Sequence, residues 1–349
     1  MEMERKVRKS SFEFLRIVCM LMIVAGHVCL QHHTDFDLRG SEWTIQLLLR
    51  GFFMIAVNVF VLISGWFGIR LKPSKLLRLT LHTWFYAIFF FVLAVIVGWH
   101  VVEWKYDVRI FLPLLTGQYW FVTCYMVLCL LAPLLNRWAE NMSGSEMKRL
   151  LKVAFPFIYL WPTLCYLLAC RQFIPDAGYG IVNFCYLYLL GFYLHRHYVD
   201  SHRARFYLYG YMSAGVMLFV VQYGLSWLLG FPFTSFYSYN TLFVFVASVK
   251  FFLFFAHVDV KSWLINRLAV PCLSVYLIHF HPCVWEPLCT FLHIEEIHGA
   301  GYFLLLFLFP IAIYAVCWVI DEMRALLLSP VERRIIERVV RLFNQKDSY

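Results

Sequence analysis

The sequence predicts an all-α protein, a polytopic bundle of about ten transmembrane helices. Apolar residues make up 62% of the 349 positions and charged residues only 15%, whereas about a quarter of the residues in soluble domains are charged. Apolar runs of membrane-spanning length recur along the whole chain. These runs cover residues 12–30, 45–68, 76–99, 111–135, 150–170, 180–195, 206–229, 238–256, 267–292 and 302–320. An ordinary soluble domain is therefore excluded.

The loops between these segments alternate in charge. Most of the 30 Lys and Arg residues fall on the side of the N-terminus, and cytoplasmic loops are enriched in these residues. Both termini are therefore expected in the cytoplasm. The same topology accounts for the net charge of +9, so no nucleic-acid partner is expected. Because no small-residue cleavage site follows His27, the first segment is expected to remain as a membrane anchor.

The first segment carries two polar residues, Arg16 and His27. Eleven helical steps are close to three turns, so both side chains are expected on one face, about 16 Å apart along the axis. Lipid offers neither group a partner, which predicts that this helix lines a functional cavity. Alternatively, Arg16 pairs with Glu13 one turn away and reaches the headgroups, while His27 lies near the outer interface.

Polar and aromatic residues also mark the second to fourth segments. Hydrogen bonding between helices explains Asn58 and Ser64 in the second segment. Arg78 lies in a short basic inner loop, where cations can meet phosphates, although topology alone accounts for them there. Trp120 and Tyr125 suit an interfacial aromatic belt, and their faces can also stack on a sugar ring.

The ninth segment contains the string LSVYLIHFHPCVWEP. His279 and His281 are two positions apart, so they point about 200° away from each other on a helix and do not face one cavity. Pro282 and Pro287 each remove a backbone hydrogen bond and predict a kink. A hydrogen-bonded packing role is the alternative to a functional role for His279.

The remaining features indicate no metal site and no further folded domain. The 11 cysteines lack metal-binding spacings and fall mostly in apolar segments, which is typical of small buried residues. After the last segment, arginines alternate with apolar residues in a tail covering residues 326–349. This tail is expected to form a basic amphipathic segment on the inner membrane surface.

The string FEFLRIVCMLMIVAGH, which ends at His27, resembles the opening helix of the bacterial acyltransferase family 3. These are integral membrane proteins that O-acylate cell-surface carbohydrates. Arg, ten residues and His are the signature of that family, matched here by Arg16 and His27. The run ending at Ser64 and Gly65, the aromatic start of the fourth segment and the Ser-x-Tyr-Leu-Ile-His string ending at His279 are similar to its later motifs.

The resemblance implies a multi-pass protein of the bacterial inner membrane with one acyltransferase domain over residues 1–325. It implies transfer of an acyl group, acetyl by family frequency, from cytoplasmic acyl-CoA to a hydroxyl of a cell-surface or exopolysaccharide glycan, with no bound cofactor. His27 would act at the reaction centre as a general base or as an acyl-carrying nucleophile, and Arg16 would orient the donor. The candidates for binding substrate or donor are Glu13, Asn58, Ser64, Arg78, Trp120, Tyr125 and His279.

Two other functions compete with this interpretation. A transporter or flippase for a lipid-linked glycan could use the same polar residues to bind an anionic headgroup or to relay protons. A glycan polymerase generally carries a long outer loop, whereas every outer loop expected here is short. Neither paired broken helices nor repeated halves of a transporter are visible in the sequence.

Overall fold

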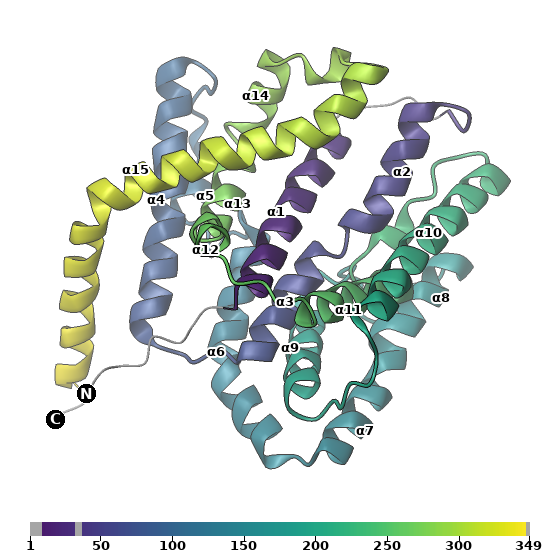
Figure 1. The fold of residues 1–349 in the computed structure, drawn as a ribbon. Coiled ribbons are helices and arrows are strands. Elements are labelled where there is room, and N and C mark those ends of the chain that lie inside the picture. Colours follow the sequence, from purple (N-terminus) through teal and green to yellow (C-terminus); the bar gives the residue numbers. More distant parts are fainter. Residues whose placement is uncertain (1–8, 32–36, 347–349) are drawn as a thin grey trace.

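The computed structural model describes residues 9–31 and 37–346, and the regular secondary structure in this part of the chain is entirely helical. Figure 1 shows the resulting helix bundle. The α-helices are α1 (Ser10–Gln31), α2 (Ser41–Phe53), α3 (Ala56–Phe67), α4 (Pro73–Val97), α5 (Trp104–Phe111), α6 (Trp120–Asn141), α7 (Gly144–Phe155), α8 (Trp161–Leu168), α9 (Ile181–Arg196), α10 (Ala204–Leu229), α11 (Leu242–Ala256), α12 (Trp263–Leu268), α13 (Cys272–His279), α14 (Trp285–Phe291) and α15 (Ala300–Lys346).

Within the described residues, eight helical stretches are long and apolar enough to cross a membrane, and each corresponds to a predicted segment. Three of them are composite: α2 continues into α3, α7 continues into α8 through a π-helical turn at Pro156–Leu160, and a 3-10 turn at Ser235–Tyr237 precedes α11. The sixth predicted segment forms α9, which has only 16 residues. The chain is thus an all-α polytopic membrane bundle, as the sequence predicts.

The ninth predicted segment, 267–292, does not form one helix. It divides into α12, α13 and α14, of which the longest has eight residues. Pro271 directly precedes α13, and Pro282 lies in the turn between α13 and α14. Proline has no N–H to continue a helical ladder, so the expected kink becomes a complete break. This break ends α13 at His279.

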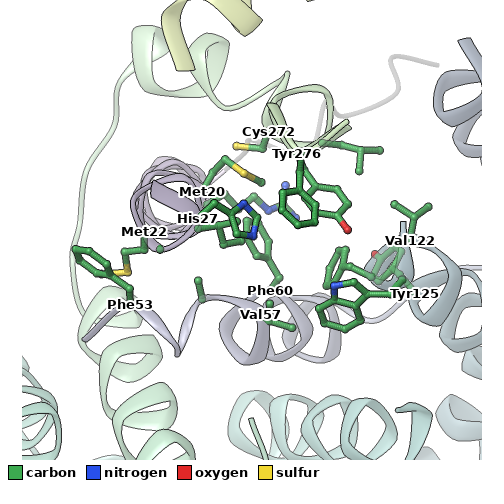
Figure 2. Close-up of a pocket in the computed structure, with 18 of the residues that line it drawn as sticks. Met20, Met22, His27, Phe53, Val57, Phe60, Val122, Tyr125, Cys272 and Tyr276 are labelled. Carbon is green, nitrogen blue, oxygen red and sulfur yellow. The ribbon is translucent and has the colours of Figure 1, made fainter. Parts of the chain in front are cut away.

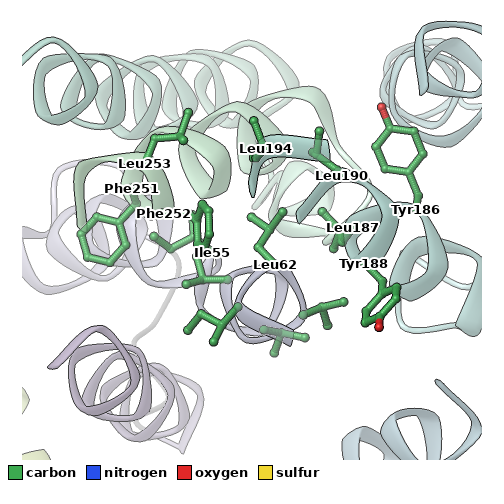
Figure 3. Close-up of a cluster of buried hydrophobic side chains, with 14 of the residues drawn as sticks. Ile55, Leu62, Tyr186, Leu187, Tyr188, Leu190, Leu194, Phe251, Phe252 and Leu253 are labelled. Carbon is green, nitrogen blue, oxygen red and sulfur yellow. The ribbon is translucent and has the colours of Figure 1, made fainter. Parts of the chain in front are cut away.

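The centre of the bundle is the contact between α3, α9 and α11. Figure 3 shows Leu62 of α3 surrounded by apolar side chains of the other two helices, including Leu187, Leu190 and Phe252. Small residues allow this close approach: a Cβ on Gly65 would collide with the backbone carbonyl of Tyr188. Gly65 therefore permits the close packing of α3 against α9.

The last helix, α15, runs continuously from Ala300 to Lys346 with two internal prolines. It bends sharply in Figure 1. The guanidinium of Arg324 donates a hydrogen bond to the carboxylate of Asp321 at 2.9 Å and another to that of Glu332 at 2.5 Å. The predicted boundary between residues 325 and 326 thus falls inside one helix, and the association of the tail with the membrane surface stays a prediction.

We expect Gly65→Ala to destabilise the bundle, because the new methyl group forces α3 and α9 apart. Overpacking of this kind costs about 1–3 kcal/mol, which corresponds to a decrease of roughly 5 °C in the unfolding midpoint. The measurement is thermal unfolding of the purified protein in detergent. Gly224→Ala on α10 is the matched control, because a Cβ there meets no atom within 4 Å. An equal midpoint for both variants would contradict the close packing.

Candidate active site

A cavity of about 620 Å³ opens between α1, the α2–α3 stretch, α6 and α13. Its walls are mostly apolar, and Figure 2 shows Met20 of α1, Phe60 of α3 and Tyr276 of α13 near the ring of His27, with Met22 beside Phe53 on the other side of α1. Arg16 lines the same cavity. The helix that carries both polar residues therefore presents them to one space within the protein, as their spacing predicts.

Glu13 and Ser64 belong to the Arg16 region of the cavity. The Nη1 atom of Arg16 lies 3.4 Å from the carboxylate of Glu13, and the arginine remains partly exposed. Ser64 lines the cavity and donates a hydrogen bond to the carbonyl of Phe60 at 2.9 Å, with the hydroxyl of Tyr125 at 3.4 Å. Arg16 thus keeps donors for a second anion, because one carboxylate occupies only part of a guanidinium.

His27 forms a buried pair with His279. The Nδ1 atom of His27 lies 2.9 Å from Nε2 of His279, although 252 positions separate the two residues. His279 is 2% exposed, and its Nδ1 lies 2.6 Å from the carbonyl oxygen of Val275. The ring of Phe280 stacks on His27 at 4.0 Å between centroids. The break after α13 places His279 against α1.

These contacts fix the proton positions in a neutral histidine pair. A carbonyl oxygen only accepts, so Nδ1 of His279 must carry a proton toward Val275. Nε2 of His279 is then an acceptor and takes the proton donated by Nδ1 of His27. The lone pair of His27 is left on Nε2, which forms no hydrogen bond within the described residues. This atom is available as a base or as a nucleophile.

Asn58 supports the cavity wall from behind. It is fully buried, donates a hydrogen bond to the carbonyl of Tyr239 at 3.0 Å and accepts one from Asn183 at 3.3 Å. Tyr239 lines the cavity together with Trp120 and Tyr179. Asn58 therefore holds an aromatic wall in place and does not itself reach the cavity.

The candidate Arg78 and the second histidine of the ninth predicted segment, His281, lie outside the cavity. Arg78 is exposed on α4, next to the lining residue Leu79, so binding of donor phosphates by Arg78 stays a prediction. His281 lies beyond the end of α13, so the helical spacing from His279 does not apply to it; its ring instead lies 3.0 Å from the carbonyl of Ala87. Within the part of the chain that the structure describes, no group of His, Cys, Asp and Glu residues is arranged to hold a metal ion.

The structure adds cavity residues that the sequence analysis did not single out. Arg50 lines the cavity from α2, Tyr179 from the loop before α9, and Tyr276 and Cys272 from α13. A single arginine near the end of an apolar segment reads as a snorkelling residue. In the sequence, the only indication of a role for Arg50 is its position inside the predicted segment 45–68.

Comparison with known proteins identifies the family. A family model described as an acyltransferase domain, that of acyltransferase family 3, matches residues 9–322. The chain belongs to acyltransferase family 3. It is therefore a membrane acyltransferase in general terms. The match covers α1, with Arg16 and His27, and also α13, with His279. No curated protein and no solved structure matches the chain.

We expect His279→Leu to lower kcat of acyl transfer by roughly 10- to 100-fold, as the partner that fixes the His27 tautomer is lost. KM for the acyl donor should stay near its wild-type value, because His279 does not line the cavity. His279→Gln should recover part of the rate, since its amide oxygen can accept the proton of His27. Steady-state kinetics on purified protein test both variants.

His281→Leu is the matched control, because it removes a similar buried hydrogen bond without touching His27. Equal losses of kcat in His279→Leu and His281→Leu, or no recovery by glutamine, would reduce His279 to a packing residue.

Proposed function

We propose that this protein is a multi-pass O-acyltransferase of the bacterial inner membrane, which transfers a short acyl group from cytoplasmic acyl-CoA to a hydroxyl of a cell-surface or exopolysaccharide glycan. Acetyl is the first acyl group to test. One observation carries the proposal: Arg16 and the unprotonated Nε2 of His27 belong to one cavity, and a hydrogen-bonded partner orients the histidine. The family supports acyl transfer as the chemistry.

The expected orientation assigns a task to each end of α1. Arg16 lies in the cytoplasmic half and binds a phosphate or carbonyl oxygen of the donor, which a guanidinium does well. The apolar walls exclude water around the thioester and so limit its hydrolysis. The acyl-bearing arm of the donor then lies along the cavity toward His27, about 16 Å away at about 1.5 Å per residue.

His27 performs the transfer in one of two ways. As a base, Nε2 removes the proton of the acceptor hydroxyl while the hydroxyl oxygen attacks the carbonyl carbon of the thioester. The C–S bond then breaks, and the imidazolium of His27 gives the proton to the leaving thiolate. As a nucleophile, Nε2 itself attacks the carbonyl carbon and the thiolate leaves; the hydroxyl then displaces the imidazole, and its proton passes to the thiolate. Both routes need the lone pair that the pairing with His279 leaves on Nε2.

We expect Arg16→Ala and His27→Ala each to abolish ester-linked acyl groups on the surface glycan without changing the amount of glycan exported. The reason is that each variant removes a group that contacts the reacting donor or acceptor. The host strain lacks its own copy of the gene, and membrane levels of every variant are matched by immunoblotting. Esters are measured on the extracted glycan by mass spectrometry and by alkaline release.

Lys250→Ala and His281→Ala are the controls, because Lys250 is another cation and His281 another imidazole, and neither residue lines the cavity. Both should retain most of the esters. If deletion of the gene instead removes the glycan from the surface and leaves its acyl content per sugar unchanged, the protein is a glycan transporter and the proposed enzyme function is wrong.

A further inference from the structure

We infer that Arg50 forms an anion-binding subsite of the cavity that His27 also lines, for a carboxylate group on one of the two substrates. The inference rests on the proposed function and specifies its substrate class. The carboxylate belongs either to the acceptor, as in a uronic acid residue of the glycan, or to the acyl group, as in a succinyl group.

The cavity has an unbalanced positive charge. Arg16 and Arg50 both line it, and none of its lining residues is Asp or Glu. Glu13 lies beside Arg16, but Arg50 has no such partner: within residues 9–31 and 37–346 its guanidinium forms no ion pair and no hydrogen bond. A charged group in a membrane interior without an opposite charge is costly, and such groups mark substrate sites.

Arg50 is held in place by an aromatic face. Its guanidinium carbon lies 4.7 Å from the ring centroid of Tyr237, which is buried. Stacking engages the flat face of the guanidinium and leaves the N–H groups on its edge available, and those N–H groups match the two oxygens of a carboxylate. The side chain is therefore oriented before any anion binds.

The position of Arg50 favours a group in the cavity over a lipid headgroup. Arg50 is nine residues after the start of α2 at Ser41, or about 13 Å along the helix axis. Leu49 packs against the apolar cluster that contains Val28 of α1. Leu49 and Val28, which are adjacent in sequence to Arg50 and His27, thus belong to one apolar cluster. Arg50 and His27 both line the cavity.

An aromatic wall next to Arg50 suits a sugar ring. The ring centroids of Trp120 and Tyr179 are 4.5 Å apart, and those of Tyr179 and Tyr239 are 4.8 Å apart. All three residues line the cavity, and Asn58 holds the backbone of Tyr239. The carboxylate of a uronic acid is bonded directly to its pyranose ring. Arg50 and the wall can therefore bind the same sugar, with a hydroxyl of that sugar near His27.

The test compares charged and neutral versions of both substrates. Unacylated glycan from the deletion strain is used as isolated and after carbodiimide and borohydride reduction, which converts uronic acids into neutral sugars. Acetyl-CoA and succinyl-CoA are the two donors. Wild type, Arg50→Gln, Arg50→Lys and the exposed control Arg109→Gln are assayed in lipid nanodiscs, and kcat/KM is measured for every combination.

We expect wild type to prefer the carboxylate-bearing substrate by 10-fold or more in one of the two comparisons, that of the glycans or that of the donors. A preference for native over reduced glycan identifies a uronate acceptor, and a preference for succinyl-CoA identifies a dicarboxylic acyl group. Arg50→Gln should remove that preference by slowing only the charged substrate, Arg50→Lys should keep part of it, and Arg109→Gln should match wild type. Equal use of charged and neutral substrates in both arms, or equal losses for both in Arg50→Gln, overturns the subsite.

A binding measurement separates this inference from the proposed function. Titration calorimetry with methyl glucuronide, methyl glucoside and succinate should show binding of a carboxylate that Arg50→Gln weakens by 10-fold or more. If this binding is present and no donor supports transfer to the glycan, the subsite stands and the acyltransferase function proposed above is wrong. If transfer occurs but neither carboxylate binds selectively, the function stands and the inference is wrong.

Discussion

The carbonyl oxygen of Val275 is the group on which the chemistry of the cavity depends. It can only accept a hydrogen bond, so it fixes the proton of His279 on Nδ1 and thereby the proton of His27 on its own Nδ1. The break in the ninth predicted segment lies next to this contact, because α13 ends at His279, which meets His27 of α1.

Hydrogen bonding separates the structural polar residues from the functional ones in this apolar bundle. Asn58 and Asn183 bind each other and nearby backbone carbonyls, and the hydroxyl of Tyr159 donates to Asn183 at 2.6 Å. Their amides are occupied, as burial in an apolar interior requires. His27 keeps a free ring nitrogen, and Arg50 keeps its edge N–H groups. Both face the cavity, where a substrate can complete their hydrogen bonds.

The sequence predicts the fold better than it predicts the site. The length of the apolar runs and the charge of the loops locate the membrane spans. The spacing of eleven residues puts Arg16 and His27 on one face of α1, and this signal can be read from the sequence because it is local to one helix. The contact between His27 and His279 joins positions 252 residues apart and depends on how α13 is broken. The sequence does not single out Arg50, because one arginine near the end of an apolar segment has an ordinary explanation. Its lack of an acidic partner is visible only in three dimensions.

The two arginines have different consequences for the direction of transfer. Arg16 shares its charge with Glu13 and remains partly exposed, which suits a donor that enters and leaves from the cytoplasmic side. Arg50 is also partly exposed, but it has only the ring of Tyr237 beneath it and, among the described residues, no carboxylate beside it, so an anion that reaches it offsets more of the cost of an unpaired charge inside the membrane. Binding of a carboxylate would thus be strongest at Arg50, in the cavity that His27 also lines. A substrate that lacks the carboxylate would leave Arg50 without an opposite charge, which is how a site rejects an incorrect substrate.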